Sequence, residues 1–310
     1  MKWTDLVQEE ALQFLRVDQV RRNEYMKEHT SFKIGGPCDL YFIPESISEI
    51  VAIYNLCRKH KVEIFILGKG SNLLITDKGI RGAVIQLAKN FSQVRFEKVD
   101  EKNYRIFAQA GISLASLAAQ AWKHSLGGME FASGIPGTLG GAVFMNAGAY
   151  GGEMKDIVTR VVGMDQQGKL LEFTPEELNF SYRHSILQER KIIALEIELL
   201  LSVEDQEEIR NKMLELNGKR KEKQPLEMPS AGSTFKRPDG FFAGKLIMDS
   251  GLSGFQIGDA MVSPKHCGFV VNKGNASADE VLRLIEHIQK TVEEQFQVRL
   301  ECEVKLIGER

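Results

Sequence analysis

Two glycine-rich segments of this chain contain the residue types that bind phosphate groups. The first is GKGSNLLI at 68–75, which directly follows the apolar run VEIFIL at 62–67. Gly68 and Gly70 let the backbone turn tightly and expose successive N–H groups, and Ser71 and Asn72 add side-chain donors, so the segment suits an anion cradle. An ordinary tight turn between two strands would look the same. The segment lacks the spacing of both the Walker A loop and the Rossmann fingerprint.

The second segment is SGIPGTLGGAVFMNAGAYGG at 133–152. Glycine loses the most conformational freedom on folding, so this density is kept where the backbone bends sharply or approaches another group closely. One interpretation is a flat or phosphorylated cofactor lying against bare backbone, and the other is a glycine-rich structural loop. Two such segments in one chain favour a dinucleotide cofactor.

Three further segments carry polar side chains. In NFSYRHS (179–185) an arginine follows Tyr182, and its planar fork suits a carboxylate, although most such arginines form surface ion pairs. Ser233 follows a glycine in a tight turn, but no activating base lies beside it, so a hydrolase nucleophile is disfavoured. Lys265 and His266 suit an anionic ligand or simply a solvated hairpin. The histidines and cysteines lack metal-ligand spacing, so no metal site is expected.

Periodicity places these segments on a mixture of helices and strands. Helices are expected over 4–20, 46–60, 113–124, 203–225 and 277–296, and the residue pairs Ser46/Glu49 and Ser277/Glu280 form capping boxes. Strands are expected over 62–67, 82–87, 105–111 and 298–308, and several more within 157–200. The elements follow no regular βαβ rhythm, which predicts an α+β chain with boundaries near 90 and 203.

Composition excludes several classes of function. The 310 residues carry a formal net charge of −2, which gives no reason to expect nucleic acid or an anionic membrane as partner. No apolar run is long enough to span a bilayer, and MKWTDLVQEE has no signal-peptide h-region. The four cysteines are sparse and lie in apolar runs, as in a reducing compartment. We therefore expect a cytoplasmic protein, and nothing in the sequence implies an oligomer.

Taken together, the segments resemble the MurB family of UDP-N-acetylenolpyruvoylglucosamine reductases. The matching pieces are GKGSNLLI, SGIPGTLGGAVFMNAGAYGGE, FSYRHSIL, AGSTFKRP and LECEVKLIG, and the match runs from 29–37 to 300–308. The resemblance implies a two-part FAD-binding domain of the vanillyl-alcohol-oxidase type, followed by a smaller α+β substrate-binding domain. The implied parts are FAD-binding subdomains over 1–89 and 90–203 and a substrate-binding domain over 204–310. The short interval from Arg183 to Ser233 is similar to the family class that lacks an extra tyrosine-bearing loop.

The resemblance also implies a role for individual residues. The catalytic residues would be Arg183, Ser233 and Glu303. FAD would be held by the two glycine-rich segments through Gly68, Lys69, Gly70, Ser71, Asn72, Leu73, Gly134, Ile135, Pro136, Gly137, Thr138, Gly140, Gly141, Asn146, Gly148 and Ala149. Candidates for binding the substrate are Tyr182, Lys245, Lys265 and His266. One departure is Arg237, which stands where many members have asparagine.

The reaction implied by this resemblance consumes NADPH as co-substrate and reduces the enolpyruvyl group of a UDP-sugar. Arg183 would stabilise negative charge beside the substrate carboxylate, Glu303 would assist when protonated, and Ser233 would give a proton to C2. Another flavin-dependent oxidoreductase with the same cofactor fold is the nearest alternative, and a nucleotide-binding sensor without turnover is a more distant one. From residue chemistry without the resemblance, only a dinucleotide-binding enzyme follows.

Overall fold

The computed structural model describes residues 2–309 and divides into two compact units. Unit 1 consists of Met1–Val20, Phe42–Gly68 and Val84–Arg220. Unit 2 consists of Arg21–Tyr41, Lys69–Ala83 and Lys221–Arg310. Each unit is therefore assembled from three separate stretches of sequence. No helix within residues 2–309 is both long and apolar enough to cross a membrane.

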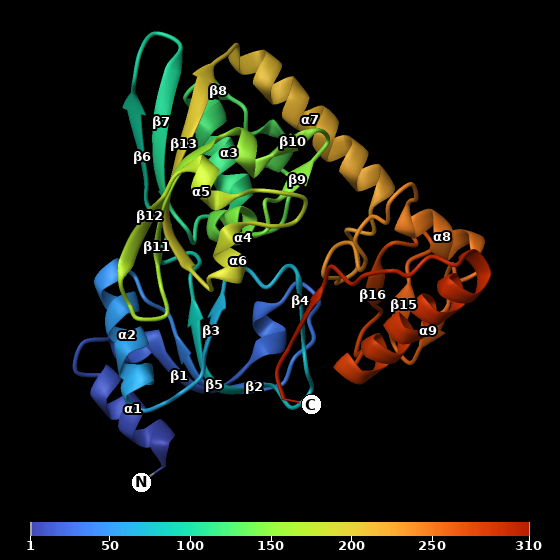
Figure 1. The fold of residues 1–310 in the computed structure, drawn as a ribbon, viewed down its shortest axis with the longest axis horizontal. Helices are drawn as coiled ribbons and strands as arrows, with labels where there is room; N and C mark the ends of the chain where they lie inside the picture. The colour runs from blue at the N-terminus through green and yellow to red at the C-terminus, as the bar shows by residue number, and fades with distance from the viewer. Residues whose placement is uncertain (1, 310) are drawn as a thin grey trace. The chain divides into compact units, whose positions relative to one another are not determined.

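An antiparallel sheet forms the centre of unit 1 (Figure 1). Its order is β12-β11-β13-β7-β6, and β8 also pairs with β13. The strands are β6 (Val94–Lys98), β7 (Asn103–Gln109), β8 (Leu126–Gly127), β11 (Val158–Met164), β12 (Leu170–Phe173) and β13 (Ile193–Val203). Helix α4 (Leu139–Phe144) packs against β13 and β7, and α5 (Pro175–Leu178) packs against β11 and β12.

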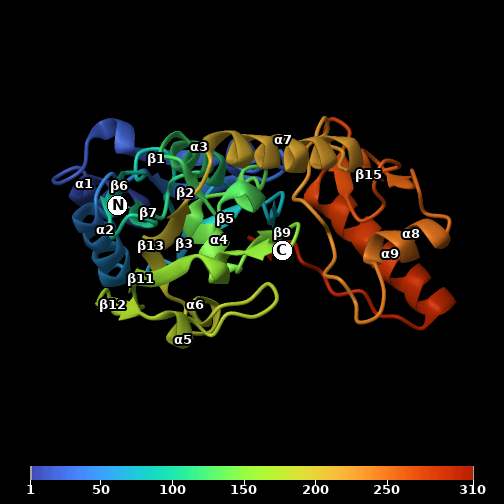
Figure 2. The ribbon, with the colours of Figure 1, turned by 90° about the horizontal axis from the view of Figure 1, so that it is seen from above.

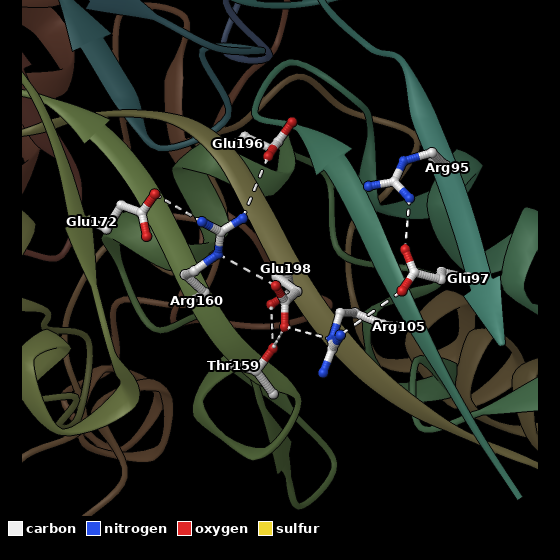
Figure 3. A network of polar contacts seen from close by, with 8 residues as sticks. All are labelled: Arg95, Glu97, Arg105, Thr159, Arg160, Glu172, Glu196 and Glu198. Atoms are coloured by element: carbon white, nitrogen blue, oxygen red, sulfur yellow. Dashed lines mark hydrogen bonds and ion pairs between the residues drawn. The ribbon is translucent and has the colours of Figure 1, made fainter. Parts of the chain in front are cut away.

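The two faces of this sheet differ because side chains alternate along each strand. In β13, Leu195, Ile197 and Leu199 are buried, and Glu196 and Glu198 lie between them on the other face. Figure 3 shows the charged network on that face. The Glu198 carboxylate receives Arg105 Nε at 2.9 Å, Arg160 Nε at 3.3 Å and the Thr159 hydroxyl at 2.9 Å. These cross-strand pairs fix the register of β7, β11 and β13.

Unit 1 contains several further elements. The helices are α1 (Trp3–Ala11), α2 (Ile47–Lys59), α3 (Leu114–Lys123) and α6 (Ile186–Glu189), with 3-10 turns η1 (Val17–Gln19), η3 (Glu130–Ala132) and η4 (Met154–Asp156). A short hairpin joins β9 (Gly148–Ala149) to β10 (Gly152–Glu153). The helix α7 (Gln206–Lys223) follows β13. A further four-stranded sheet does not belong to unit 1 alone. Its order is β1 (Val20–Tyr25), β2 (Pro37–Phe42), β5 (Ile80–Gln86) and β3 (Ile64–Leu67); β1 and β2 fall almost wholly in unit 2, and β3 falls in unit 1.

Unit 2 has its own core around a long amphipathic helix, α9 (Ala278–Phe296). Its buried stripe includes Val281, Leu284, Ile288 and Val292, and full burial of each such side chain contributes about 1.5–3 kcal/mol. The helix packs on α8 (Ala243–Asp249), as Figure 2 shows, and on the sheet β14-β15-β16. These and the remaining elements are η2 (Met26–His29), β4 (Leu73–Ile75), β14 (Gln256–Ile257), β15 (Ala260–Val262), β16 (Val270–Asn272) and β17 (Lys305–Ile307).

Contacts between residues that are distant in sequence join the separate stretches of unit 2. Strand β17 pairs in parallel with β4, from Lys305 opposite Leu73 to Ile307 opposite Ile75. Asp77, in the turn after β4, accepts hydrogen bonds from the N–H groups of Ala278 and Asp279 at 2.9 and 3.2 Å. A side chain from the β4–β5 turn therefore caps the first turn of α9.

The structure confirms some of the expected elements and shortens others. The capping box of Ser277 and Glu280 is present, but that of Ser46 and Glu49 is only half formed. Ser46 accepts from the N–H of Glu49, whereas Glu49 Oε2 accepts from the N–H of Glu45 at 2.8 Å. The expected N-terminal helix over 4–20 ends at Ala11. The expected strand over 298–308 is reduced to β17 and an isolated bridge between Phe235 and Cys302. Its alternation survives, because Leu300 and Val304 are buried while Glu301 and Lys305 are exposed.

We expect Asp77→Ala to lower the free energy of unfolding by about 1 kcal/mol, the usual effect of losing an N-terminal cap. Urea denaturation measures the change. Asp239→Ala is the matched control, since Asp239 is exposed in the same unit and has no hydrogen bond among the described residues. That variant should stay within about 0.5 kcal/mol of the parent. Equal losses in the two variants would contradict a capping role for Asp77.

Candidate functional site

The 68–72 loop, which comprises Gly68 to Asn72, presents unused hydrogen-bond donors. Within residues 2–309, the backbone N–H groups of Lys69, Gly70, Ser71 and Asn72 donate to no other protein group. Gly70 is itself buried, with φ of +60°, and a side chain there would collide with the carbonyl of His29. A buried N–H without a partner is unfavourable unless a ligand or water accepts from it. This donor set suits the diphosphate of a dinucleotide.

The two glycine-rich segments meet in unit 1. A Cβ atom built on Gly68 would lie 2.5 Å from Thr138 Oγ1, so only glycine allows this approach. The Thr138 hydroxyl in turn accepts from the N–H of Gly141 and caps α4. The remaining expected cofactor residues follow in order: Leu73 begins β4, Gly134, Ile135, Pro136 and Gly137 form the loop before α4, Gly140 and Gly141 lie in α4, and Gly148 and Ala149 form β9.

Ser233 and Glu303 are neighbours within unit 2. The N–H of Glu303 donates to the carbonyl of Thr234 at 2.9 Å, which places Glu303 beside the residue that follows Ser233. Thr234 is buried, and its hydroxyl accepts from the N–H of Val270 at 2.9 Å. Ser233 is exposed, and its hydroxyl has no partner among the described residues. The buried Thr234 therefore fixes the backbone next to Ser233, whose hydroxyl is exposed.

Asn72 connects this pair to the 68–72 loop. Its Nδ2 donates to the carbonyl of Glu303 at 3.2 Å, and its own carbonyl accepts from the N–H of Lys305 at 3.0 Å. The expected cofactor loop and two expected catalytic residues thus belong to one hydrogen-bonded assembly in unit 2. Sequence patterns did not indicate this connection, because Asn72 and Glu303 are 231 residues apart.

Arg183 lies in unit 1, in a tight turn from Ser181 to His184 that we call the arginine turn. The N–H groups of Ser181 and His184 each donate to the other residue's carbonyl at 3.1 Å. Arg183 has φ of +55°, a conformation that non-glycine residues adopt at a cost and that recurs at functional sites. Its guanidinium lies 5.3 Å from the centre of the exposed Tyr182 ring, and Nη1 donates to the carbonyl of Gly148 at 3.4 Å.

Asn146, expected among the cofactor residues, supports the arginine turn. Its side chain is 1% exposed, and Nδ2 donates to the carbonyl of Ser181 at 3.0 Å and to Glu153 Oε2 at 2.7 Å. Its Oδ1 accepts from the N–H of Lys155 at 3.0 Å. All polar atoms of this side chain have partners within the protein, so the geometry favours a supporting role over contact with a ligand.

The three residues of unit 2 that are expected to bind the substrate differ in their charge and in the protein groups that they already contact. Lys245 is ion-paired with Asp249 at 2.8 Å, and Lys265 lies 3.6 Å from Glu227 and donates to the carbonyl of Lys221. His266 is half-buried, and burial lowers its pKa below the ordinary 6.5. Its Nδ1 accepts from the N–H of Gly268 at 3.1 Å, which places the ring proton on Nε2. His266 is therefore a neutral donor rather than a cation.

Arg220 is a functional candidate that stands in a basic run of the sequence with Lys219, Lys221 and Lys223. In the structure it is half-buried, and its aliphatic chain packs against Gly134. Burial lowers its pKa, although an arginine remains charged. The guanidinium has no hydrogen-bond or ion-pair partner among the described residues. Only its position beside a glycine-rich loop distinguishes it from its basic neighbours, and the sequence alone does not reveal that position.

Two family models match the chain. A model described as FAD binding domain matches residues 38–174, and one described as UDP-N-acetylenolpyruvoylglucosamine reductase, C-terminal domain, matches residues 224–307. Together with the mixed helices and strands, they confirm the expected fold class, an α+β chain in which an FAD-binding domain precedes a smaller C-terminal domain.

Full-length relatives carry the same description. A UDP-N-acetylenolpyruvoylglucosamine reductase of Caldanaerobacter subterraneus is 50% identical over 306 residues, which is 99% of either chain. One of Alkaliphilus metalliredigens is 50% identical and covers 97% of each chain. The crystal structure of the reductase from Thermus caldophilus superimposes with a TM-score of 0.78 at 36% identity, over 93% of this chain and 98% of that one.

We expect the imidazole of His266 to titrate below the ordinary 6.5, with its proton on Nε2, as measured by NMR of the ring nitrogens. Because the unfolded chain would then bind this proton more readily than the folded one, His266 lowers stability as pH falls below about 6.5. Denaturant unfolding at several pH values should show a shallower pH dependence for His266→Gln. A titration midpoint above 6.5, or a proton on Nδ1, would contradict this assignment.

Proposed function

Since the chain belongs to the UDP-N-acetylenolpyruvoylglucosamine reductase family, we propose that it is an FAD-dependent enzyme that makes UDP-N-acetylmuramate. It uses NADPH to reduce the enolpyruvyl group of UDP-N-acetylglucosamine enolpyruvate to the lactyl ether, a step in the synthesis of peptidoglycan precursors. The observation that carries the proposal is the assembly in unit 2, where the donor-rich 68–72 loop, Ser233 and Glu303 are joined through Asn72 and Thr234.

The 68–72 loop and the loop before α4 hold the FAD. The unbonded N–H groups of residues 69–72 donate to the diphosphate. The second glycine-rich segment is held close to the protein at Gly134, which lies against Asn217, and at Gly140, which lies against Ala110. FAD, when bound, supplies the carrier that accepts hydride from NADPH and passes it to the substrate. Residues 1–203 form the FAD-binding part of the chain, divided near 90, and residues 204–310 form the substrate-binding part.

Ser233 is the proton donor. The reduction adds a hydride to C3 of the enolpyruvyl group and a proton to C2, so a donor must face C2. A serine hydroxyl is a weak acid, but the charge that develops at C2 is strongly basic, and the transfer runs downhill. The exposed hydroxyl of Ser233 has no competing partner among the described residues, and the buried Thr234 beside it keeps the backbone fixed.

Arg183 and Glu303 act on the carboxylate of the substrate, into which the developing charge at C2 is delocalised. The guanidinium of Arg183 stays charged and has the fork geometry that matches a carboxylate. Glu303 contributes by hydrogen bonding when it holds a proton, because an ionised Glu303 would repel the same charge. Tyr182, which is exposed beside Arg183, contributes a hydroxyl to the bound substrate.

Binding of the diphosphate of the substrate requires cations and donors. Lys245 and Lys265 exchange their carboxylate partners for phosphate oxygens, and His266 adds a neutral Nε2–H donor. Arg220 offers a further positive charge that no protein carboxylate neutralises among residues 2–309. We place the enzyme in the cytoplasm, where the free cysteines Cys38, Cys57, Cys267 and Cys302 remain reduced.

The visible absorbance of the purified protein tests this function directly. Under anaerobic conditions NADPH should bleach the flavin band, and UDP-N-acetylglucosamine enolpyruvate should restore it. Bleaching without recovery would leave a flavin oxidoreductase with another substrate. A protein that takes up no FAD on reconstitution would overturn the proposal.

Ser233→Ala should separate the two halves of the reaction. The reduction of FAD by NADPH should proceed at the parental rate, because no proton is delivered to C2 in that step. Reoxidation by the substrate should slow by at least about 100-fold, the usual range for loss of a proton donor. Stopped-flow absorbance measures both rates, and equal slowing of the two steps would rule out the donor role.

A further inference from the structure

The supports of the arginine turn lie within unit 1 and are distinct from the groups that meet the substrate. The turn itself is held by its two internal hydrogen bonds, and Arg183 stands at the position with φ of +55°. A turn with a non-glycine residue in this region is strained and persists only where its surroundings over-determine it. Groups outside the turn must therefore hold Arg183 in this conformation.

One support comes from α4 and reaches the C-terminal side of the turn. The carbonyl of Phe144 accepts from the hydroxyl of the buried Ser185 at 2.8 Å and from Gln188 Nε2 at 2.8 Å. The same Gln188 amide donates to the carbonyl of Arg183 at 3.1 Å. These bonds hold the chain after Arg183, but none of them holds Ser181, the residue at which the chain enters the turn.

The other support is Asn146, which anchors the chain before Arg183. The carbonyl of Ser181 receives Asn146 Nδ2 in addition to the N–H of His184, and the second proton of Nδ2 bonds to Glu153 Oε2. The N–H of Lys155 fixes the orientation of the amide by donating to Oδ1. An amide matches this place, because a carboxylate would face two acceptors and a hydrophobic side chain would leave the N–H of Lys155 without its acceptor.

We propose that Asn146, held by Glu153, is a positioning residue for Arg183 in the reaction. It touches neither the substrate nor the reacting atoms, and its contribution passes through the conformation of the arginine turn. The inference rests on the proposed function, because it takes Arg183 to stabilise charge on the substrate. A displacement of about 1 Å in such a group is enough to cost about 100-fold in rate.

The test compares both half-reactions in Asn146→Asp, Arg183→Ala and the double variant. Asn146→Asp should slow reoxidation by the substrate by about 100-fold and leave the rate of reduction by NADPH and the Kd for FAD within about 2-fold. The double variant should be no slower than Arg183→Ala, since residues that act through one group are non-additive. Hydrogen exchange at the N–H of His184, which donates to Ser181, should accelerate in Asn146→Asp.

Conservative and control variants complete the design. Glu153→Gln keeps an acceptor for Nδ2 and should retain reoxidation within about 3-fold, whereas Glu153→Ala should approach Asn146→Asp. Asn179→Ala is the matched control, since Asn179 also has a positive φ of 45° and precedes the turn, yet its side chain makes no hydrogen bond among the described residues. It should leave both half-reactions unchanged.

The outcomes separate the inference from the function on which it rests. Slowing of both half-reactions, weaker FAD binding or multiplicative losses in the double variant would overturn the positioning role of Asn146 while Arg183 remains catalytic. If Arg183→Ala itself reoxidises at the parental rate, the proposed role of Arg183 is wrong, and the positioning inference is overturned with it.

Discussion

The hydrogen bonds between the 68–72 loop and the segment around Glu303 are the constraint on which unit 2 depends. Asn72 bonds to the chain on both sides of Val304, and β4 and β17 continue the contact as a parallel pair. The N–H of Glu303 is in turn bonded to the carbonyl of Thr234. Asp77, which follows β4, accepts from the N–H of Ala278 in the first turn of α9. The loop that carries the unbonded donors and the segments of Ser233 and Glu303 are therefore hydrogen-bonded into one framework within this unit.

The sequence reveals features of the fold whose signals are local. The N-caps at Ser46 and Ser277, the capping box at Ser277 and the stripe of α9 depend on residues three or four positions apart, and the structure confirms them. The strand expected over 298–308 is a different case, because a strand is completed by its partner. Alternation indicated which side chains are buried, but not that the segment bridges Phe235 at Cys302 and then pairs with β4 through β17.

Some parts of the candidate site can likewise be predicted from the sequence, and others depend on residues far away in the chain. The glycine-rich segments and the motifs around Arg183, Ser233 and Glu303 are contiguous in sequence and can be read from it. The hydrogen bonds that connect or support these segments cannot be predicted from the sequence. Asn146 sits in a glycine-rich segment and looks like a ligand contact, yet its place depends on Ser181 and Glu153. Arg220 looks like one basic residue among several until the structure places it beside Gly134.

The pairing of β4 with β17 also sets an order of events during synthesis. A ribosome delivers the 68–72 loop early, but the residues that hold it, Glu303 and β17, follow some 231 positions later. Until they emerge, β4 is an unpaired apolar strand edge, the kind of surface that chaperones protect from association. A nascent chain that ends before residue 303 therefore lacks the partners that hold the 68–72 loop, and this loop reaches its final hydrogen bonding only when synthesis is nearly complete.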